Sequence, residues 1–77
     1  MPREKLYKIG EVMEDTGLSR QTIHNYTLAG LIYEKRRTRS GHRLYEEDVF
    51  DRLKQIKMLQ AKNYTLQQIK KILAEEA

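Results

Sequence analysis

Residues 16–31 read TGLSRQTIHNYTLAGL, and this stretch decides the fold because a turn, a helix start and a helix stop follow one another within it. Gly17 can adopt the left-handed backbone conformation that ends a helix. Ser19 is a good N-cap, since its hydroxyl can accept a hydrogen bond from the free amides of the next turn. We therefore expect a helix over residues 20–29 that stops at Gly30.

The residues just before this stretch predict another short helix. The apolar side chains of Ile9, Val12 and Met13 recur at the i, i+3, i+4 spacing of one helix face. In the following helix, Ile23 is expected to face inward. Two short helices joined by a glycine-containing turn of about three to four residues are typical of a helix-turn-helix. We place this unit at about residues 9–29.

A β-hairpin is predicted next, over about residues 31–45. Two short strand-like runs, Leu31-Ile32-Tyr33 and Arg43-Leu44-Tyr45, flank a segment with the turn signal Ser40-Gly41. An isolated two-stranded ribbon is barely stable in water. The hairpin must therefore lean on the helices and leave its tip in solvent.

A second helical pair is predicted at about residues 47–74. Apolar positions at helical spacing indicate one helix over residues 47–61, and Asn63 is a plausible stop. Thr65 begins a capping box that opens the last helix. The whole chain, residues 1–77, is then a single mainly α domain with a small β-hairpin, in the order helix–helix–hairpin–helix–helix.

The net charge of +4 comes from one short segment. Residues 1–33 and residues 46–77 are each electrically balanced, whereas residues 34–45 carry five basic side chains against the single acid Glu34. The five are Lys35, Arg36, Arg37, Arg39 and Arg43. Charge concentrated in this way suggests a polyanionic partner, and the guanidinium fork of arginine matches phosphate. A solvated basic loop is the alternative that charge alone leaves open.

Several functional classes are disfavoured by the composition. There is no cysteine, which excludes disulfides, thiolate nucleophiles and cysteine-based zinc sites. The longest apolar run is three residues, against the roughly 20 of a membrane helix. His24 and His42 have no second histidine at metal-ligand spacing. We expect no catalytic residue, no metal site, no cofactor and no enzymatic activity, in a cytoplasmic protein.

A spaced series of short motifs runs from about residue 7 to residue 73. It comprises Ile9-Gly10-Glu11-Val12, Thr16-Gly17-Leu18-Ser19, Thr22-Ile23, Gly30-Leu31-Ile32, Gly41-His42-Arg43-Leu44-Tyr45, Asp48-Val49 with Leu53, and Tyr64-Thr65-Leu66 with Ile69 and Leu73. In this series the chain resembles the DNA-binding domain of the MerR family of bacterial transcription regulators. The resemblance implies a winged helix-turn-helix in which the second helix enters the major groove and the hairpin wing contacts the DNA backbone.

The second helix departs from the family pattern at one place. Relatives usually read Arg-Tyr-Tyr followed by an acid there, whereas this chain reads His24-Asn25-Tyr26-Thr27, so that only Tyr26 matches. Asn25 has the amide group that pairs with an adenine edge; the alternative is that replacing a phosphate-contacting residue with Asn only weakens binding. Thr27 in place of the acid removes a charge that would repel DNA.

The resemblance, with the charge pattern, assigns a set of DNA-contacting residues. They are Ser19, Arg20, Gln21 and Thr22 on the first turn of the second helix, His24, Asn25 and Tyr26 behind them, Arg36, Arg37, Arg39, His42 and Arg43 in the wing, and Lys62 and Tyr64 before the last helix. Ser19 also caps its helix, Tyr26 is half in the core with its hydroxyl free to reach phosphate, and Tyr45 packs at the base of the hairpin. Four to five phosphate contacts would give a slope of log K against log salt of about −4.

Relatives continue into a long helix that pairs two subunits, followed by an effector-sensing part. Because this chain stops at Glu75-Glu76-Ala77, we expect a fragment of a longer regulator that forms a homodimer and binds a palindromic promoter site in the bacterial nucleoid; a small stand-alone relative is the alternative. Two other functions stay open. One is an excisionase-like architectural DNA-binding factor, and the other is a protein-docking module whose wing meets an acidic partner protein.

Overall fold

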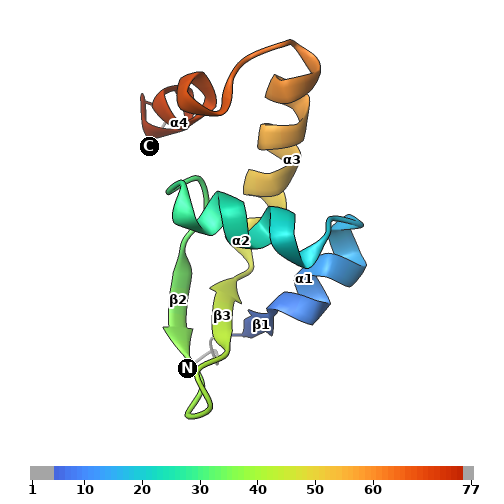
Figure 1. The fold of residues 1–77 in the computed structure, drawn as a ribbon, viewed down its shortest axis with the longest axis vertical. Coiled ribbons are helices and arrows are strands. Elements are labelled where there is room, and N and C mark those ends of the chain that lie inside the picture. The colour runs from blue at the N-terminus through green and yellow to red at the C-terminus, as the bar shows by residue number, and fades with distance from the viewer. Residues whose placement is uncertain (1–4, 76–77) are drawn as a thin grey trace.

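The computed structural model describes residues 5–75 and shows four helices with a small sheet (Figure 1). In chain order the elements are β1 (Leu6–Lys8), α1 (Ile9–Thr16), α2 (Arg20–Leu28), β2 (Glu34–Arg37), β3 (Arg43–Glu46), α3 (Asp48–Ala61) and α4 (Leu66–Glu75). The sheet is antiparallel with strand order β1-β3-β2. The predicted mainly α class and the order of the helices around a hairpin are confirmed.

The local signals that predict the helix boundaries do so correctly. Gly17 follows α1 in the left-handed conformation, with φ of 75°, and its amide donates to the carbonyl of Met13. Ser19 caps α2, because its Oγ accepts from the amide of Thr22 at 3.1 Å. At the start of α4 the predicted capping box is formed: Thr65 Oγ1 accepts from the Gln68 amide, and the Gln68 side chain accepts from the Thr65 amide.

The predicted strand at residues 31–33 is wrong. Leu31 and Ile32 follow the turn at Gly30 and are buried in the core, with exposed fractions of 0% and 1%. Their amides donate to the carbonyl of Tyr26, so this backbone closes the end of α2 instead of pairing with a strand. The strand that does pair with β3 begins at Glu34, in the charged segment.

The hairpin is also not an isolated ribbon. β1 pairs with β3 along its whole length, with Leu6 opposite Glu46 and Lys8 opposite Leu44. β3 is therefore the middle strand of a three-stranded sheet. The short strand β1 escapes sequence analysis because a three-residue strand has too few positions for an alternating pattern.

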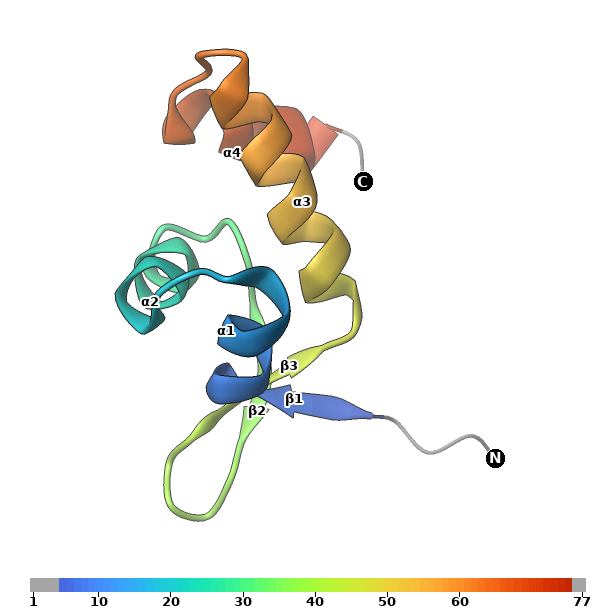
Figure 2. The same cartoon turned by 90° about the vertical axis from the view of Figure 1, so that its right-hand side faces the viewer.

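The core lies where α1, α2, β3, α3 and α4 meet. Its buried side chains are Val12, Ile23, Tyr26, Leu31, Ile32, Tyr45, Val49, Leu53, Ile56, Ile69 and Leu73. α2 crosses the middle of the molecule, with the sheet on one side and the α3–α4 pair on the other (Figure 1). Turned by 90°, the loop between β2 and β3 projects away from all four helices (Figure 2). We call β2, β3 and this loop the wing.

Within residues 5–75 every helix falls short of the length and apolar character that spanning a membrane requires. The same residues bring together no group of three or more side chains of the types that hold a metal ion.

Candidate nucleic-acid interface

A groove of about 710 Å³ runs between the outer face of α2 and the wing, with the start of α1 as its floor. It is lined by Lys8, Ile9, Gly10, Glu11 and Glu14 from the α1 side, by Arg20, Gln21 and His24 from α2, and by Gly41, His42 and Arg43 from the wing. Five of the predicted DNA-contacting residues are thus brought to one groove from two separate elements.

The exposed face of α2 presents a pair of amide side chains. Gln21 Nε2 donates to Asn25 Oδ1 at 2.9 Å, one helical turn away. Each amide keeps further donor or acceptor positions, which are the groups that recognise base edges in a major groove. Ser19 and Thr22 instead bond to each other, with 2.9 Å between their hydroxyl oxygens, and Arg20 is exposed beside them.

Tyr26 differs from its expected role. Its side chain is 8% exposed, and its hydroxyl donates to Gln60 Oε1 on α3 at 3.1 Å. The hydroxyl proton is therefore used within the fold and is not free for a phosphate, contrary to the expectation from the sequence. This hydrogen bond instead joins α2 to the last turn of α3.

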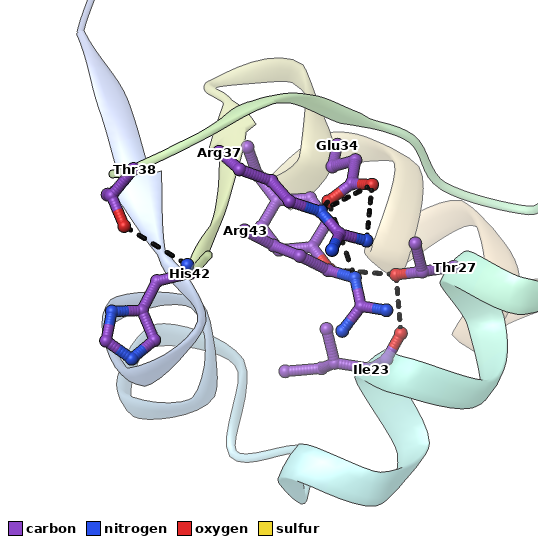
Figure 3. Close-up of polar contacts among 8 residues, drawn as sticks. Ile23, Thr27, Glu34, Arg37, Thr38, His42 and Arg43 are labelled. Atoms are coloured by element: carbon purple, nitrogen blue, oxygen red, sulfur yellow. Dashed lines mark hydrogen bonds and ion pairs between the residues drawn. The ribbon is translucent and has the colours of Figure 1, made fainter. Parts of the chain in front are cut away.

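A charged cluster joins β2 to β3 within the wing (Figure 3). Arg37 donates to both carboxylate oxygens of Glu34, from Nε at 3.3 and 3.1 Å and from Nη2 at 3.1 Å. Arg43 Nε lies 3.4 Å from the same carboxylate. The hydrogen bonds that Arg37 donates to the Glu34 carboxylate, and the charge of that carboxylate, raise the pKa of Arg37 above its ordinary value.

A β-bulge brings this cluster together. Residues three apart in a regular strand point to opposite faces of the sheet. The register shifts between Glu34 and Arg36, so that Glu34 lies opposite Tyr45 while Arg37 lies opposite Arg43. Because Tyr45 and Arg43 share a face of β3, their two partners share a face as well.

The five cations of the basic segment fall into two groups. Arg37 and Arg43 face Glu34, and Lys35 lies 3.3 Å from Glu46. Arg36 and Arg39 are exposed and have no ion pair with any other side chain in the described part of the chain. Sequence analysis treats Arg36, Arg37 and Arg39 alike and misses the pairing of Glu34. The signal for it is that Glu34 is the single acid of the segment.

Thr27 is a residue whose role the sequence does not reveal. Its Oγ1 donates to the Ile23 carbonyl at 2.8 Å and lies 2.8 Å from the Tyr45 hydroxyl. Tyr45 is fully buried, which confirms its expected place at the base of the hairpin. Thr27 therefore connects α2 to the middle strand of the sheet.

His42 lines the groove, and Lys62 and Tyr64 do not. The backbone of His42 closes the wing loop, because its amide donates to Thr38 Oγ1 and its carbonyl accepts from the Thr38 amide. Lys62 and Tyr64 are exposed in the turn between α3 and α4, at the end of the molecule opposite the wing (Figure 1). The fold does not bring these two residues into the groove.

A second hollow has the opposite charge. It has a volume of about 650 Å³ and is lined by Tyr7, Glu11, Glu14, Asp15, Glu47, Phe50 and Asp51. Five of these seven side chains are acidic, and none is basic. Positive charge is therefore concentrated in the wing and negative charge in this hollow.

Comparison with known proteins places the chain in a family. The model of the MerR HTH family regulatory protein matches residues 7–76. The chain is 40% identical, over 87% of its length, to the mercuric resistance operon regulatory protein of Bacillus cereus, and 36% identical, over 94%, to nodulation protein NolA of Bradyrhizobium elkanii. It spans 51% of the former protein and 33% of the latter.

Solved structures agree in fold. A MerR family transcriptional regulator from Bacillus cereus superimposes with a TM-score of 0.80 at 24% identity, over 91% of this chain and 52% of that one. HTH-type transcriptional regulator SkgA from Caulobacter crescentus superimposes with a TM-score of 0.73 at 25% identity, over 88% of this chain and 49% of that one. The winged helix-turn-helix fold is thereby confirmed, and the chain belongs to the MerR family of helix-turn-helix regulatory proteins.

Proposed function

We propose that this chain binds double-stranded DNA sequence-specifically, as the DNA-reading module of a bacterial transcription regulator. The observation that carries the proposal is the groove in which Arg20, Gln21 and His24 of α2 face the basic wing. α2 enters the major groove and reads base edges with its N-terminal half. The wing lies along the neighbouring phosphates, where Arg36 and Arg39, exposed and without an ion pair among the described residues, bind them.

The family membership supports the proposal, because the mercuric resistance operon regulatory protein and both solved structures are named as regulators of bacteria. A regulator assembled from two such chains would read a palindromic promoter site, and Lys62 and Tyr64 would contact backbone beyond α2. We assign the domain no catalytic role and place its action at the nucleoid in the cytoplasm.

The test is a fluorescence-anisotropy titration with a labelled duplex of about 25 base pairs, at a series of salt concentrations. Four to five phosphate contacts predict a slope of log K against log salt of about −4. Competition with single-stranded DNA and with an acidic polypeptide separates duplex reading from simple polyanion binding. A slope near zero, or equal competition by the polypeptide, would contradict the proposal.

A further inference from the structure

We infer that Glu34 is a positioning residue for the proposed DNA binding. Its carboxylate lies beside Nε of the Arg43 guanidinium and keeps this cation oriented into the groove beside α2. Arg37 in turn holds the carboxylate. The inference rests on the proposed function. It gives Arg37 the role of orienting Glu34, and through it Arg43, in place of the phosphate contact expected from the sequence.

Within residues 5–75, the Nε group of Arg43 has the Glu34 carboxylate as its one ion-pair partner. Arg43 is 24% exposed, and its Nε is buried and makes no hydrogen bond within residues 5–75. The Glu34 oxygen lies at 3.4 Å, within ion-pair distance but without hydrogen-bond geometry. A buried charged donor with no counter-charge is costly, so without Glu34 the guanidinium is expected to turn out toward solvent.

Glu34 is itself fixed in orientation. The bulge at Lys35 places Glu34 and Arg37 on the same face, and three donor–acceptor contacts of 3.1 to 3.3 Å join Arg37 to the two carboxylate oxygens. Arg37 is 52% exposed, so this surface ion pair adds little to stability by itself. Its effect is geometric, because it leaves Glu34 Oε2 directed at Arg43 (Figure 3).

Removing the acid of Glu34 can raise or lower the affinity for DNA, and the direction distinguishes a positioning role from a purely electrostatic one. An acid in a phosphate-binding wing repels DNA, so its removal should strengthen binding if charge alone matters. If Glu34 positions Arg43, its removal should weaken binding, because the cation is then no longer correctly placed.

The experiment compares Glu34→Gln with Glu46→Gln in the same duplex titration. Glu46 is a matched control, since it lies on the same hairpin, pairs with Lys35 and is 45% exposed. Both variants remove one negative charge from the wing. We expect Glu34→Gln to weaken binding about fivefold and Glu46→Gln to leave it unchanged or stronger. Binding by Glu34→Gln that equals or exceeds wild type would overturn the inference.

A double-mutant cycle identifies the group on which Glu34 acts. In an Arg43→Ala background, Glu34→Gln is expected to cause no further loss of affinity. An equal loss in both backgrounds would show that Glu34 does not act through Arg43. Thermal melting of each variant separates these effects from a loss of folding.

An NMR measurement on the free protein tests the role of Glu34 without relying on DNA binding. If wild-type protein binds no duplex, the proposed function fails, but the NMR signal of the Arg43 Nε–H group in the free protein still reports its environment. We expect Glu34→Gln to shift this signal and speed its exchange with water. If Glu34→Gln does not fold, Arg37→Gln is expected to shift the same signal. An unchanged Arg43 signal would overturn the inference.

Discussion

The hydroxyl of Tyr45 lies 2.8 Å from Oγ1 of Thr27, which ties the middle strand of the sheet to α2. Thr27 donates its only hydroxyl proton to the Ile23 carbonyl, so Tyr45 must be the donor in this contact. Because β3 is part of the wing, this hydrogen bond connects the wing to α2, the two elements that line the groove.

Tyr45→Phe removes this donor without changing the packed ring. We expect the free energy of unfolding to fall by about 1 kcal/mol, because the Thr27 oxygen loses its partner at a part-buried site. Thermal or urea unfolding measures the change. Tyr33→Phe is the control, since Tyr33 is 66% exposed and the same substitution there should have no effect. Equal stability of the two variants would contradict this role of Tyr45.

Arg36 and Arg39, which have no ion pair within residues 5–75, should determine the salt dependence of DNA binding. Replacing both Arg36 and Arg39 with Gln is expected to make the slope of log K against log salt shallower by about two, roughly one for each phosphate that is no longer neutralised. Lys54→Gln with Lys57→Gln is the matched control, because it removes the same charge from α3. If both double variants change the slope equally, the wing has no special role.

Gln21 should affect which sequence is bound more than how tightly DNA is held in general. Gln21→Ala removes the amide that bonds to Asn25 on the outer face of α2. We expect the discrimination between a specific and a scrambled duplex to fall by about 1–3 kcal/mol with an unchanged salt slope. The ratio of the two Kd values measures this. Gln21→Ala that weakens both duplexes equally would show that Gln21 does not read bases.

Two glycines should respond to alanine in opposite directions. Gly30 has φ of +76°, and a Cβ there would lie 3.1 Å from Lys70 Nζ. Gly30→Ala is therefore expected to destabilise the fold by about 1–2 kcal/mol. Gly10 is the second residue of α1 and a Cβ there would meet open space, so Gly10→Ala should stabilise by about 0.4–1 kcal/mol. Differential scanning calorimetry measures both. A lower melting temperature for Gly10→Ala or a higher one for Gly30→Ala would be evidence against this backbone account.

Sequence reasoning succeeds where the deciding interaction is local. Gly17 ends α1 and Ser19 begins α2 through contacts within one turn, and the same holds for Thr65 with Gln68. Side-chain chemistry at a fixed spacing is enough to predict such caps. The MerR-type motif series extends these local signals to the whole winged helix-turn-helix.

It fails where the partner is distant along the chain. β1 is a strand because it pairs with β3. Leu31 and Ile32 are not in the sheet, because their side chains are buried in the core. The Tyr26 hydroxyl is taken by Gln60, 34 residues later. Glu34 and Arg37 are only three residues apart, but their pairing depends on a bulge where β2 pairs with the more distant β3. Thus the elements could be predicted, but not which charges of the candidate site are already paired.

The central claim is that the outer face of α2 and the wing contact duplex DNA together. An amide-shift titration of the labelled protein with a duplex at low ionic strength tests it most directly. We expect the largest shifts in residues 19–25 and 36–43, with the acidic hollow around Asp15 and Asp51 unaffected. Shifts centred on that acidic hollow, or a spectrum left unchanged by duplex, would contradict the claim.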